Sequence, residues 1–380
     1  MRKFSFLFML ILVVELNVAA KIRRVGFFGS PISGTDYSTF DLANTAAVSG
    51  DTILMFPNTT INGIVTKKLI LIGPGNWLDP NSTPKGNANL QAFAGIATIS
   101  SIFFDAGSAG SVITGFYGGN IYVQDNNITI ERNCEILVYI TYHPSSAVVS
   151  MNNLQVLQNY RVNLQQYLNN GSSATNMNIS NNLITRIYTP PGNTYSGNIS
   201  NNVWAFDATQ SANNLNGGAS TSSGNNNIEL GGGAYLLQNN IFVSYTNASA
   251  PSSFNYFIFS NGGNSIFNYN LALESSVPIN WGTGVGNVIT PITNAANIFT
   301  AFPLIGTASG DARYQLTASS PAKIANRPGS TVDAGMFAGT SPYKLSTIPT
   351  IPTIYALSSP QGNNPPGTTI QINVSTRGNN

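Results

Sequence analysis

The sequence predicts an all-β solenoid, in which short strands stack coil upon coil around a shared core. Three observations favour it: short apolar runs recur along the chain, stretches rich in Asn, Gly and Ser separate them, and helical patterns are scarce. One coil of this kind cannot bury its own apolar face, whereas stacked coils share a continuous core. Hydrophobic residues make up 42% of the 380 residues and aromatics 10%, which excludes a disordered chain.

A repeated unit marks the expected coils. Each unit is an apolar residue, a polar step, an Asn pair and an apolar restart, as in residues 178–184 and, 20 residues later, 198–204. A period of about 20 residues or its multiples is typical of a β-solenoid. Further copies lie at residues 236–242, 266–271 and 123–130.

The Asn pair lies where each coil is expected to turn. An Asn at such a corner tolerates the left-handed backbone conformation, and its side chain can hydrogen-bond the Asn of the next coil. The repeats therefore predict an Asn ladder along the stack. A β-sandwich or a propeller is the main alternative, but tight hairpins between alternating strands, which a sandwich needs, are missing from the sequence.

Before the repeats, the chain predicts a short helix followed by strands. Residues 39–48 have apolar side chains at helical spacing, and Ser49-Gly50-Asp51 ends the pattern. Residues 52–57 are typical of a strand closed by proline, and residues 68–72 of a strand that stops at Gly73-Pro74-Gly75.

These segments resemble the pectate-lyase-like superfamily of right-handed parallel β-helix proteins. That family opens with a capping helix, a "GDTI…P" strand and a "K…LILIGPG" strand, which here are residues 40–48, 50–57 and 68–75. The resemblance covers residues 25–345 and implies one right-handed parallel β-helix with an N-terminal capping helix. It implies no particular activity, because the superfamily includes lyases, polygalacturonases, phage tailspikes and adhesins. The other matching segments, shared with bacterial β-helix proteins, are residues 111–116, 314–316, 319–322 and 333–335.

The ends of the chain predict a secreted protein with a C-terminal extension. Residues 1–20 combine two early basic residues, an apolar run and small residues before an expected cut after Ala20, as in a signal peptide. The apolar run is shorter than the ~20 residues that span a bilayer. We expect the β-helix over residues 21–345. Residues 346–380 are expected to form a proline-punctuated linker and a β-strand pair, which either caps the solenoid or docks to a surface partner.

The low charge excludes several classes of partner. Charged residues are 8% of the chain, against about 25% in typical proteins, so there is no basic footprint for nucleic acid. The single cysteine, Cys134, and the single histidine, His143, predict neither a disulfide nor a His-based metal site. Cys134 would be a nucleophile only with a base such as His143, and a small buried residue beside a strand is the favoured interpretation. We expect no metal, no cofactor and a monomer.

Acid–base chemistry on a sugar needs ionisable side chains close to the bond that breaks. No lysine lies between Lys85 and Lys323, and the paired aspartates of the polygalacturonase pattern are absent. If coil stacking gathers the charged residues in one groove, an arginine-based lyase follows; solvated or mutually paired charges are the alternative. The catalytic candidates are Glu131, Arg132, Glu135, Arg161, Arg186, Asp207 and Glu229.

Aromatic residues give candidate ligand-binding positions. Trp204, Tyr188 and Tyr245 can stack on sugar rings from an exposed sheet, or else fill the core. If the strand alternates, either Val203 or Trp204 must face outward. We expect a protein that binds a polysaccharide or a cell-surface structure without catalysis. The alternatives are a polysaccharide lyase or glycoside hydrolase with a divergent active site, and a structural or adhesin component of the surface.

Overall fold

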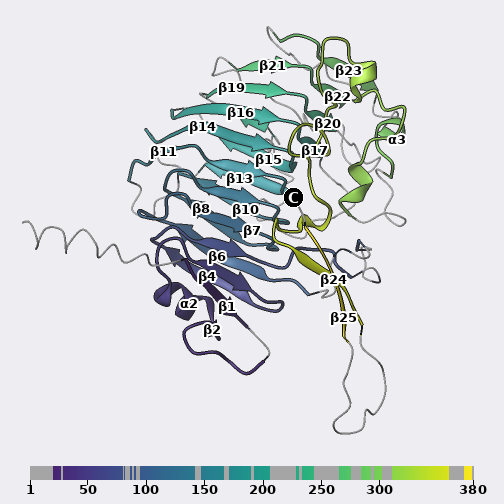
Figure 1. The fold of residues 1–380 in the computed structure, drawn as a ribbon. Helices are drawn as coiled ribbons and strands as arrows, with labels where there is room; N and C mark the ends of the chain where they lie inside the picture. Colours follow the sequence, from purple (N-terminus) through teal and green to yellow (C-terminus); the bar gives the residue numbers. More distant parts are fainter. Residues whose placement is uncertain are drawn as a thin grey trace, which may run out of the picture.

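A computed structural model defines the fold over most of the chain. It describes residues 20–26, 29–79, 81, 86–87, 90, 95–141, 147–166, 171–189, 192–205, 228–230, 233–243, 265–274, 284–291, 295–301, 310–358 and 372–378. Over these residues the protein is all-β and solenoid-like, with two long parallel sheets whose strands stack along one axis (Figure 1). This confirms the predicted fold class at that level.

The first sheet, sheet A, contains 12 described strands, and every neighbouring pair is parallel. In sheet order they are β2 (Asp36–Tyr37), β1 (Ile22–Val25), β3 (Thr52–Met55), β5 (Ile70–Ile72), β7 (Val112–Thr114), β9 (Thr129–Glu131), β12 (Gln155–Leu157), β14 (Ser173–Ser180), β16 (Thr194–Ser200), β19 (Gly233–Gln238) and β21 (Ile266–Asn268), with β11 (Ser150–Asn152) also on β14.

The second sheet, sheet B, contains 11 described strands, again parallel. They are β4 (Thr60–Val65), β6 (Thr98–Phe104), β8 (Asn120–Val123), β10 (Leu137–Ile140), β13 (Val162–Gln166), β15 (Leu183–Thr189), β17 (Val203–Ala205), β20 (Ile241–Val243), β22 (Leu271–Glu274) and β23 (Val288–Pro291), with β18 (Ile228–Leu230) on the second half of β15. From β7 onward, most coils contribute one strand to sheet A and the next strand to sheet B, as β7 and β8 do.

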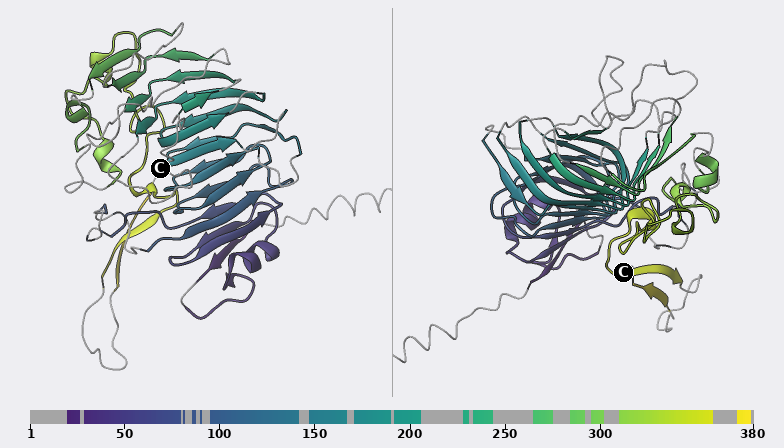
Figure 2. Two further views of the ribbon diagram at one scale, coloured as in Figure 1. Left: turned by 180° about the vertical axis from the view of Figure 1, so that it is seen from behind. Right: turned by 90° about the horizontal axis from the view of Figure 1, so that it is seen from above.

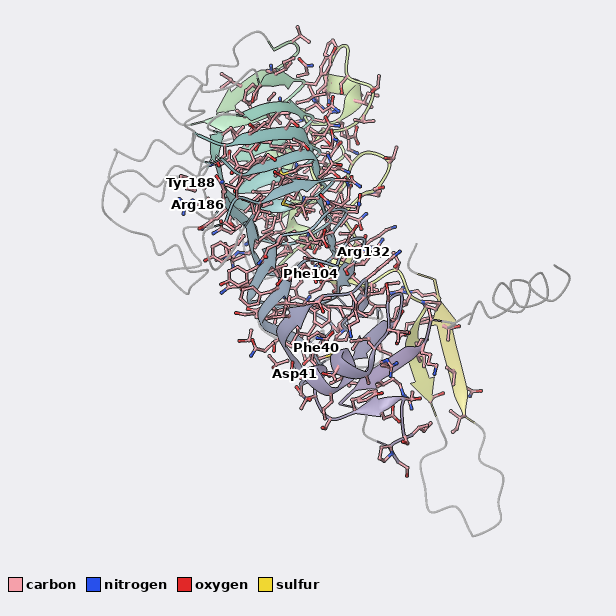
Figure 3. The ribbon with its side chains drawn as sticks, turned by 90° about the vertical axis from the view of Figure 1, so that its left-hand side faces the viewer. Phe40, Asp41, Phe104, Arg132, Arg186 and Tyr188 are labelled. Carbon is pink, nitrogen blue, oxygen red and sulfur yellow. The ribbon has the colours of Figure 1, made fainter. Side chains whose placement is uncertain are left out.

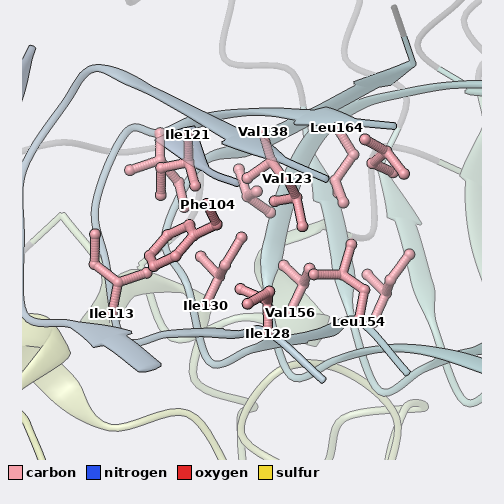
Figure 4. Packing of buried hydrophobic residues seen from close by; sticks show 14 of the residues in the cluster. Phe104, Ile113, Ile121, Val123, Ile128, Ile130, Val138, Leu154, Val156 and Leu164 are labelled. Carbon is pink, nitrogen blue, oxygen red and sulfur yellow. The ribbon is translucent and has the colours of Figure 1, made fainter. Parts of the chain in front are cut away.

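The core lies between the two sheets. In β8 the side chains of Ile121 and Val123 are buried while Asn120 and Tyr122 are half-buried, which is the period-two alternation of a strand with one inward face. Figure 4 shows such inward side chains of sheet B facing those of sheet A across the interior. Each fully buried Val, Leu, Ile or Phe contributes roughly 1.5–3 kcal/mol, so the shared core is the main source of stability.

The predicted Asn ladder is present, but the left-handed conformation and the ladder hydrogen bonds belong to two different residues of each pair. The first Asn of each pair takes the left-handed conformation, with φ of 59° at Asn181 and 55° at Asn201. The second Asn is fully buried and forms the ladder, since Asn182 Nδ2 donates to Asn202 Oδ1 at 3.0 Å. The ladder comprises Asn133, Asn159, Asn182, Asn202, Asn240, Asn270 and Asn287.

One predicted repeat belongs to a different corner. The pair Asn126-Asn127 lies at the corner where the chain leaves β8 of sheet B for β9 of sheet A, whereas the ladder lies at the corner where the chain leaves a sheet A strand for a sheet B strand. Its side chains bond the following coil there, with Asn153 Nδ2 donating to Asn127 Oδ1 at 2.8 Å. The shape of the repeat is therefore shared by two corners of the coil, because both need a left-handed residue and a side chain that reaches the next coil.

The ends of the stack carry the few helical elements described. Helix α2 (Phe40–Ala46) lies where the sequence predicts a helix, at the N-terminal end of the stack, and buries Phe40 and Ala43. Helix α3 (Ala295–Ile298) is a single turn beyond β23. Within the described residues, no helix combines the length and hydropathy needed to cross a membrane.

Residues 310–350, here called the strap, return along the outside of the solenoid (Figure 2). The strap includes the 3₁₀ turns η2 (Ala312–Tyr314), η3 (Ile324–Asn326) and η4 (Leu345–Thr347), and it follows the corner at which the two sheets converge. It runs from the late coils back to the early ones. Its bonds to the corner are Gly335 N to Asn239 O, Asn201 Nδ2 to Asp333 O, Asn181 Nδ2 to Met336 O, Gln158 Nε2 to Ser341 O, Arg132 Nη1 to Ile348 O and Asn76 Nδ2 to Thr347 Oγ1.

The strap also covers apolar side chains that point out of the solenoid. Val203 and Ile241 face outward and are fully buried against Ala334 and Met336 in a second apolar cluster. Beyond the strap, β24 (Thr353–Ser358) and β25 (Asn373–Arg377) pair as an antiparallel hairpin that projects from the stack (Figure 1). The strap follows the side of the solenoid, and the described hairpin does not cover an end of it.

Candidate functional site

The structure separates the predicted catalytic residues. Glu131 ends β9 in sheet A, and Arg132 is the corner residue that follows it. Glu135 and Arg161 lie at the turn before sheet B, whereas Arg186 lies within β15. Figure 3 places Arg132 on the opposite side of the stack from Arg186 and Tyr188. Glu229 lies in β18 beside Tyr188, and Asp207 falls outside the described residues.

Glu135 and Arg161, from consecutive coils, meet at this turn. Arg161 Nη1 lies 2.8 Å from Glu135 Oε1, and Tyr117 Oη donates to Glu135 Oε2 at 2.8 Å. Both charged residues have left-handed backbones, with φ of 55° and 56°, at the same position of consecutive coils. Burial, together with the charge of Glu135, raises the pKa of Tyr117, so the phenol stays protonated and donates. Glu135 thus holds one partner on each carboxylate oxygen, Arg161 on Oε1 and Tyr117 on Oε2.

Arg132 anchors the strap. Its Nε donates to Gln158 Oε1 at 2.6 Å and its Nη1 to the carbonyl oxygen of Ile348 at 3.0 Å. Burial lowers the pKa of Arg132 and raises that of Glu131. Because the guanidinium of Arg132 is covered by chain from a distant part of the sequence, it presents no face to a substrate.

Trp204 is buried, contrary to the expectation that it presents an aromatic surface. It is 2% exposed, points into the core and packs on Phe242 with ring centroids 5.3 Å apart. The strand does alternate, and Val203 is the outward residue. Val203 is nevertheless buried as well, because the strap covers it. Tyr245 lies outside the described residues.

Cys134 is fully buried at the turn before β10. Burial raises the pKa of its thiol well above the ordinary value, which agrees with a packed, unreactive side chain. His143 is outside the described residues. In the part of the chain that the structure describes, no group of three or more His, Cys, Asp or Glu side chains is placed to hold a metal ion.

An aromatic stack that the sequence analysis did not single out lies on the outer face of sheet B. Phe103, Tyr122 and Tyr139 occupy the same position in β6, β8 and β10. Their ring centroids are 4.3 and 4.7 Å apart, with planes within 5° and 7° of parallel. In the sequence, Tyr122 and Tyr139 each lie between two apolar residues, as "IYV" and "VYI". This alternation predicts that the tyrosines point away from the core, and it is the signal that could have predicted the stack.

The same row continues into later coils. Gln165 lies beside Tyr139, and Tyr188 lies beside Gln165. The guanidinium of Arg186 lies over the Tyr188 ring, 5.0 Å from its centroid. A second outward row, two residues earlier in each strand, brings Asn163 next to Arg186, and Gln165 Nε2 donates to Asn163 Oδ1 at 3.2 Å. The outer strip of sheet B is defined as Phe103, Asn120, Tyr122, Tyr139, Asn163, Gln165, Arg186 and Tyr188.

The outer strip is a repeating surface rather than a pocket. It crosses the strands at right angles, and its members recur at each coil, about 4.8 Å apart. In the stack the rings cover one another's faces, so Tyr122 and Tyr139 offer edges and hydroxyl groups, while the amides of Asn120 and Gln165 offer donors and acceptors. Asn163 points the same way but is buried, with 4% of its surface exposed. Such a surface suits a polymer with repeating hydroxyl groups.

Comparison with known proteins adds no family to this description. No protein-family model matches the chain, and no curated protein matches it.

Proposed function

We propose that this chain is a secreted right-handed parallel β-helix protein that binds a polysaccharide on the outer strip of sheet B, without cleaving it. The strip carries the proposal, because it joins aromatic edges, hydroxyl groups and amides into one regular row over five strands. The low charge of the chain, 8%, favours a neutral glycan over a strongly acidic one.

Two features support the handedness and the superfamily. Strand–crossover–strand connections within one parallel sheet are right-handed in about 98% of cases, and each passage from one sheet A strand to the next is such a connection. The motifs at residues 50–57 and 68–75 fall on β3 and β5, which pair in sheet A. This arrangement supports membership of the pectate-lyase-like superfamily.

The separation of the charged candidates supports binding over cleavage. Arg186 belongs to the outer strip, whereas the Glu135–Arg161 pair lies at a turn and Arg132 under the strap. A general acid and base must both reach one glycosidic bond. In the described part of the chain, these groups are instead engaged with one another or with the backbone.

The test is affinity gel electrophoresis of residues 21–380 in gels containing neutral or acidic polysaccharides. Tyr139→Ala and Tyr188→Ala should each weaken retention by a neutral polysaccharide about two- to tenfold, since an aromatic contact is worth roughly 0.5–1.5 kcal/mol. Tyr139→Phe keeps the stacked ring and reports on the hydroxyl alone. Tyr355→Ala is the matched control, because it removes an exposed tyrosine of the hairpin.

Each sample is also assayed for unsaturated product and for new reducing ends. We expect retention without product. Product that disappears in Arg161→Ala would favour a lyase, because Arg161 lies outside the outer strip. Undiminished retention of folded Tyr139→Ala and Tyr188→Ala would remove the outer strip as the binding site.

The projecting hairpin favours a second candidate, attachment to a cell surface. Ile354, Tyr355 and Val374 are exposed on β24 and β25. Deleting residues 352–380 should then abolish surface retention while leaving the solenoid folded. Full retention of the deleted protein would exclude the hairpin as the attachment point.

A further inference from the structure

We infer that cleavage after Ala20 creates a structural ion pair, in which the new α-ammonium group of Lys21 binds the buried carboxylate of Asp51. This inference concerns maturation and is independent of the proposed polysaccharide site. It takes from the sequence the cut after Ala20 and from the structure the position of the nitrogen that the cut would free.

The Lys21 nitrogen already lies against Asp51. Lys21 N is 2.8 Å from Asp51 Oδ1, and Thr52 N donates to Lys21 O at 2.9 Å. These two bonds hold Lys21 in register with β3 at the start of β1. Ala20 and Lys21 are both exposed, so the bond between them lies at the surface while the nitrogen points toward a buried acid.

Asp51 has a buried carboxylate surrounded by N–H donors. Its side chain is 0% exposed in the turn between α2 and β3. Besides Lys21 N, it accepts from Arg23 Nε at 2.8 Å and from Val48 N at 3.0 Å. Arg23 also donates to Tyr37 Oη at 2.7 Å, so its charge is shared with a second partner.

The reaction that frees the nitrogen is hydrolysis of the Ala20–Lys21 amide. Water supplies the oxygen of the new Ala20 carboxylate, the C–N bond breaks, and the amine of Lys21 takes a proton at neutral pH. A neutral amide N–H that donates to the Asp51 carboxylate thereby becomes an ammonium group. The hydrogen bond then also carries the Coulomb attraction between two opposite charges. Removal of the leader would therefore tighten the N-terminal end of the solenoid.

The first measurement is the N-terminal sequence of the exported protein, by mass spectrometry of the intact chain. Lys21 as the first residue supports the inference, and any other first residue overturns it. The second is the pKa of the α-amine, followed by NMR after reductive methylation with ¹³C-formaldehyde. The ionisable groups around it are Asp51, Arg23 and Tyr37. We expect the pKa of the α-amine to lie at least about one unit above the ordinary value of about 8. A pKa at or below that value would overturn the pairing.

An insertion variant tests the stabilising effect. Two residues, Ser-Gly, placed between Ala20 and Lys21 move the ammonium away while leaving the Lys21 amide in position. We expect this insertion to lower the melting temperature of the wild type. In the Asp51→Asn background, we expect the same insertion to leave the melting temperature unchanged. Lys21→Gln is the control, since it removes the exposed side-chain charge and keeps the α-amine. If Asp51→Asn does not fold, the α-amine pKa of the wild type decides the question by itself.

Discussion

At the scale of single residues, two neighbouring positions form the corner that carries the Asn ladder, and each has a different role. The first position adopts a positive φ, and the second is Asn, whose short amide side chain both donates and accepts along the stack. The first position tolerates other residues, since Arg132 and Gln158 hold it in earlier coils. The Asn-pair pattern therefore misses the coils of Asn133 and Asn159. The second Asn alone is the better sequence signal.

Replacing one ladder residue should be costly. In Asn202→Ala, the backbone N–H and the side-chain Nδ2 of Asn182 both lose the acceptor Asn202 Oδ1, and Asn240 Oδ1 and the carbonyl of Ile179 each lose one donor. An unsatisfied buried polar group costs about 1–3 kcal/mol, so we expect a loss of about 3 kcal/mol or more in the free energy of unfolding, measured in urea.

The control for the ladder is Asn198→Ala. Asn198 belongs to the same repeat but is exposed on β16, so we expect a change within about 0.5 kcal/mol. Equal effects of the two substitutions would contradict a structural role of the ladder.

Asp51 should make stability depend on pH. Burial alone would raise its pKa, but hydrogen bonds from Lys21 and Val48 and the contact with Arg23 lower it below the ordinary value. A carboxyl with a lowered folded pKa stabilises fully above its unfolded pKa of about 3.9, and this stabilisation is lost as the pH falls through the folded pKa. As the pH falls from about 5 to about 2, the wild type should lose more stability than Asp51→Asn, as read from unfolding midpoints. A parallel loss in both proteins would show that Asp51 contributes nothing to acid unfolding.

At the scale of elements, the strap explains why the outward residue of β17 is buried. Alternation of β17 correctly requires one outward residue, and that residue is Val203. Sequence periodicity cannot tell an outward face that meets water from one covered by chain more than a hundred positions later. Ala334 and Met336, the strap residues that cover Val203, lie in a segment without strand or helix, where periodicity gives no prediction.

Truncations should show that loss of the hairpin leaves the melting temperature unchanged, whereas loss of the end of the strap lowers it. A chain that ends at Ile351 keeps the bonds of Asn76 to Thr347 and of Arg132 to Ile348, so we expect a melting temperature close to that of the full chain. A chain that ends at Leu345 loses both bonds and should melt lower, because the buried Arg132 guanidinium then loses its carbonyl partner. Identical melting curves for the two truncations would argue against the strap as a stabilising element.

At the scale of the whole molecule, the sequence predicted the stacking better than the site. Apolar runs at a regular period require a shared core, and α2, β3 and β5 appear where the motifs placed them. The outer strip was missed because its members are single residues, such as Tyr122 and Tyr139, that become neighbours only through the register between coils. The partners of the charged residues could not be predicted for the same reason, because pairs such as Glu135 and Arg161 also form through the register between coils.

The binding account makes one claim about the whole solenoid: the ligand is recognised by several coils at once. The outer strip crosses the strands from β6 to β15, a span of roughly 19 Å at about 4.8 Å per coil. Calorimetric titration of residues 21–380 with a length series of oligosaccharides, cut from the polysaccharide that retains the protein, tests this most directly. We predict that affinity rises with each added sugar until the oligosaccharide fills the strip, and then levels off. Equal affinity for a disaccharide and for the longest oligosaccharide would contradict the account, because it would place recognition in one compact pocket elsewhere on the molecule.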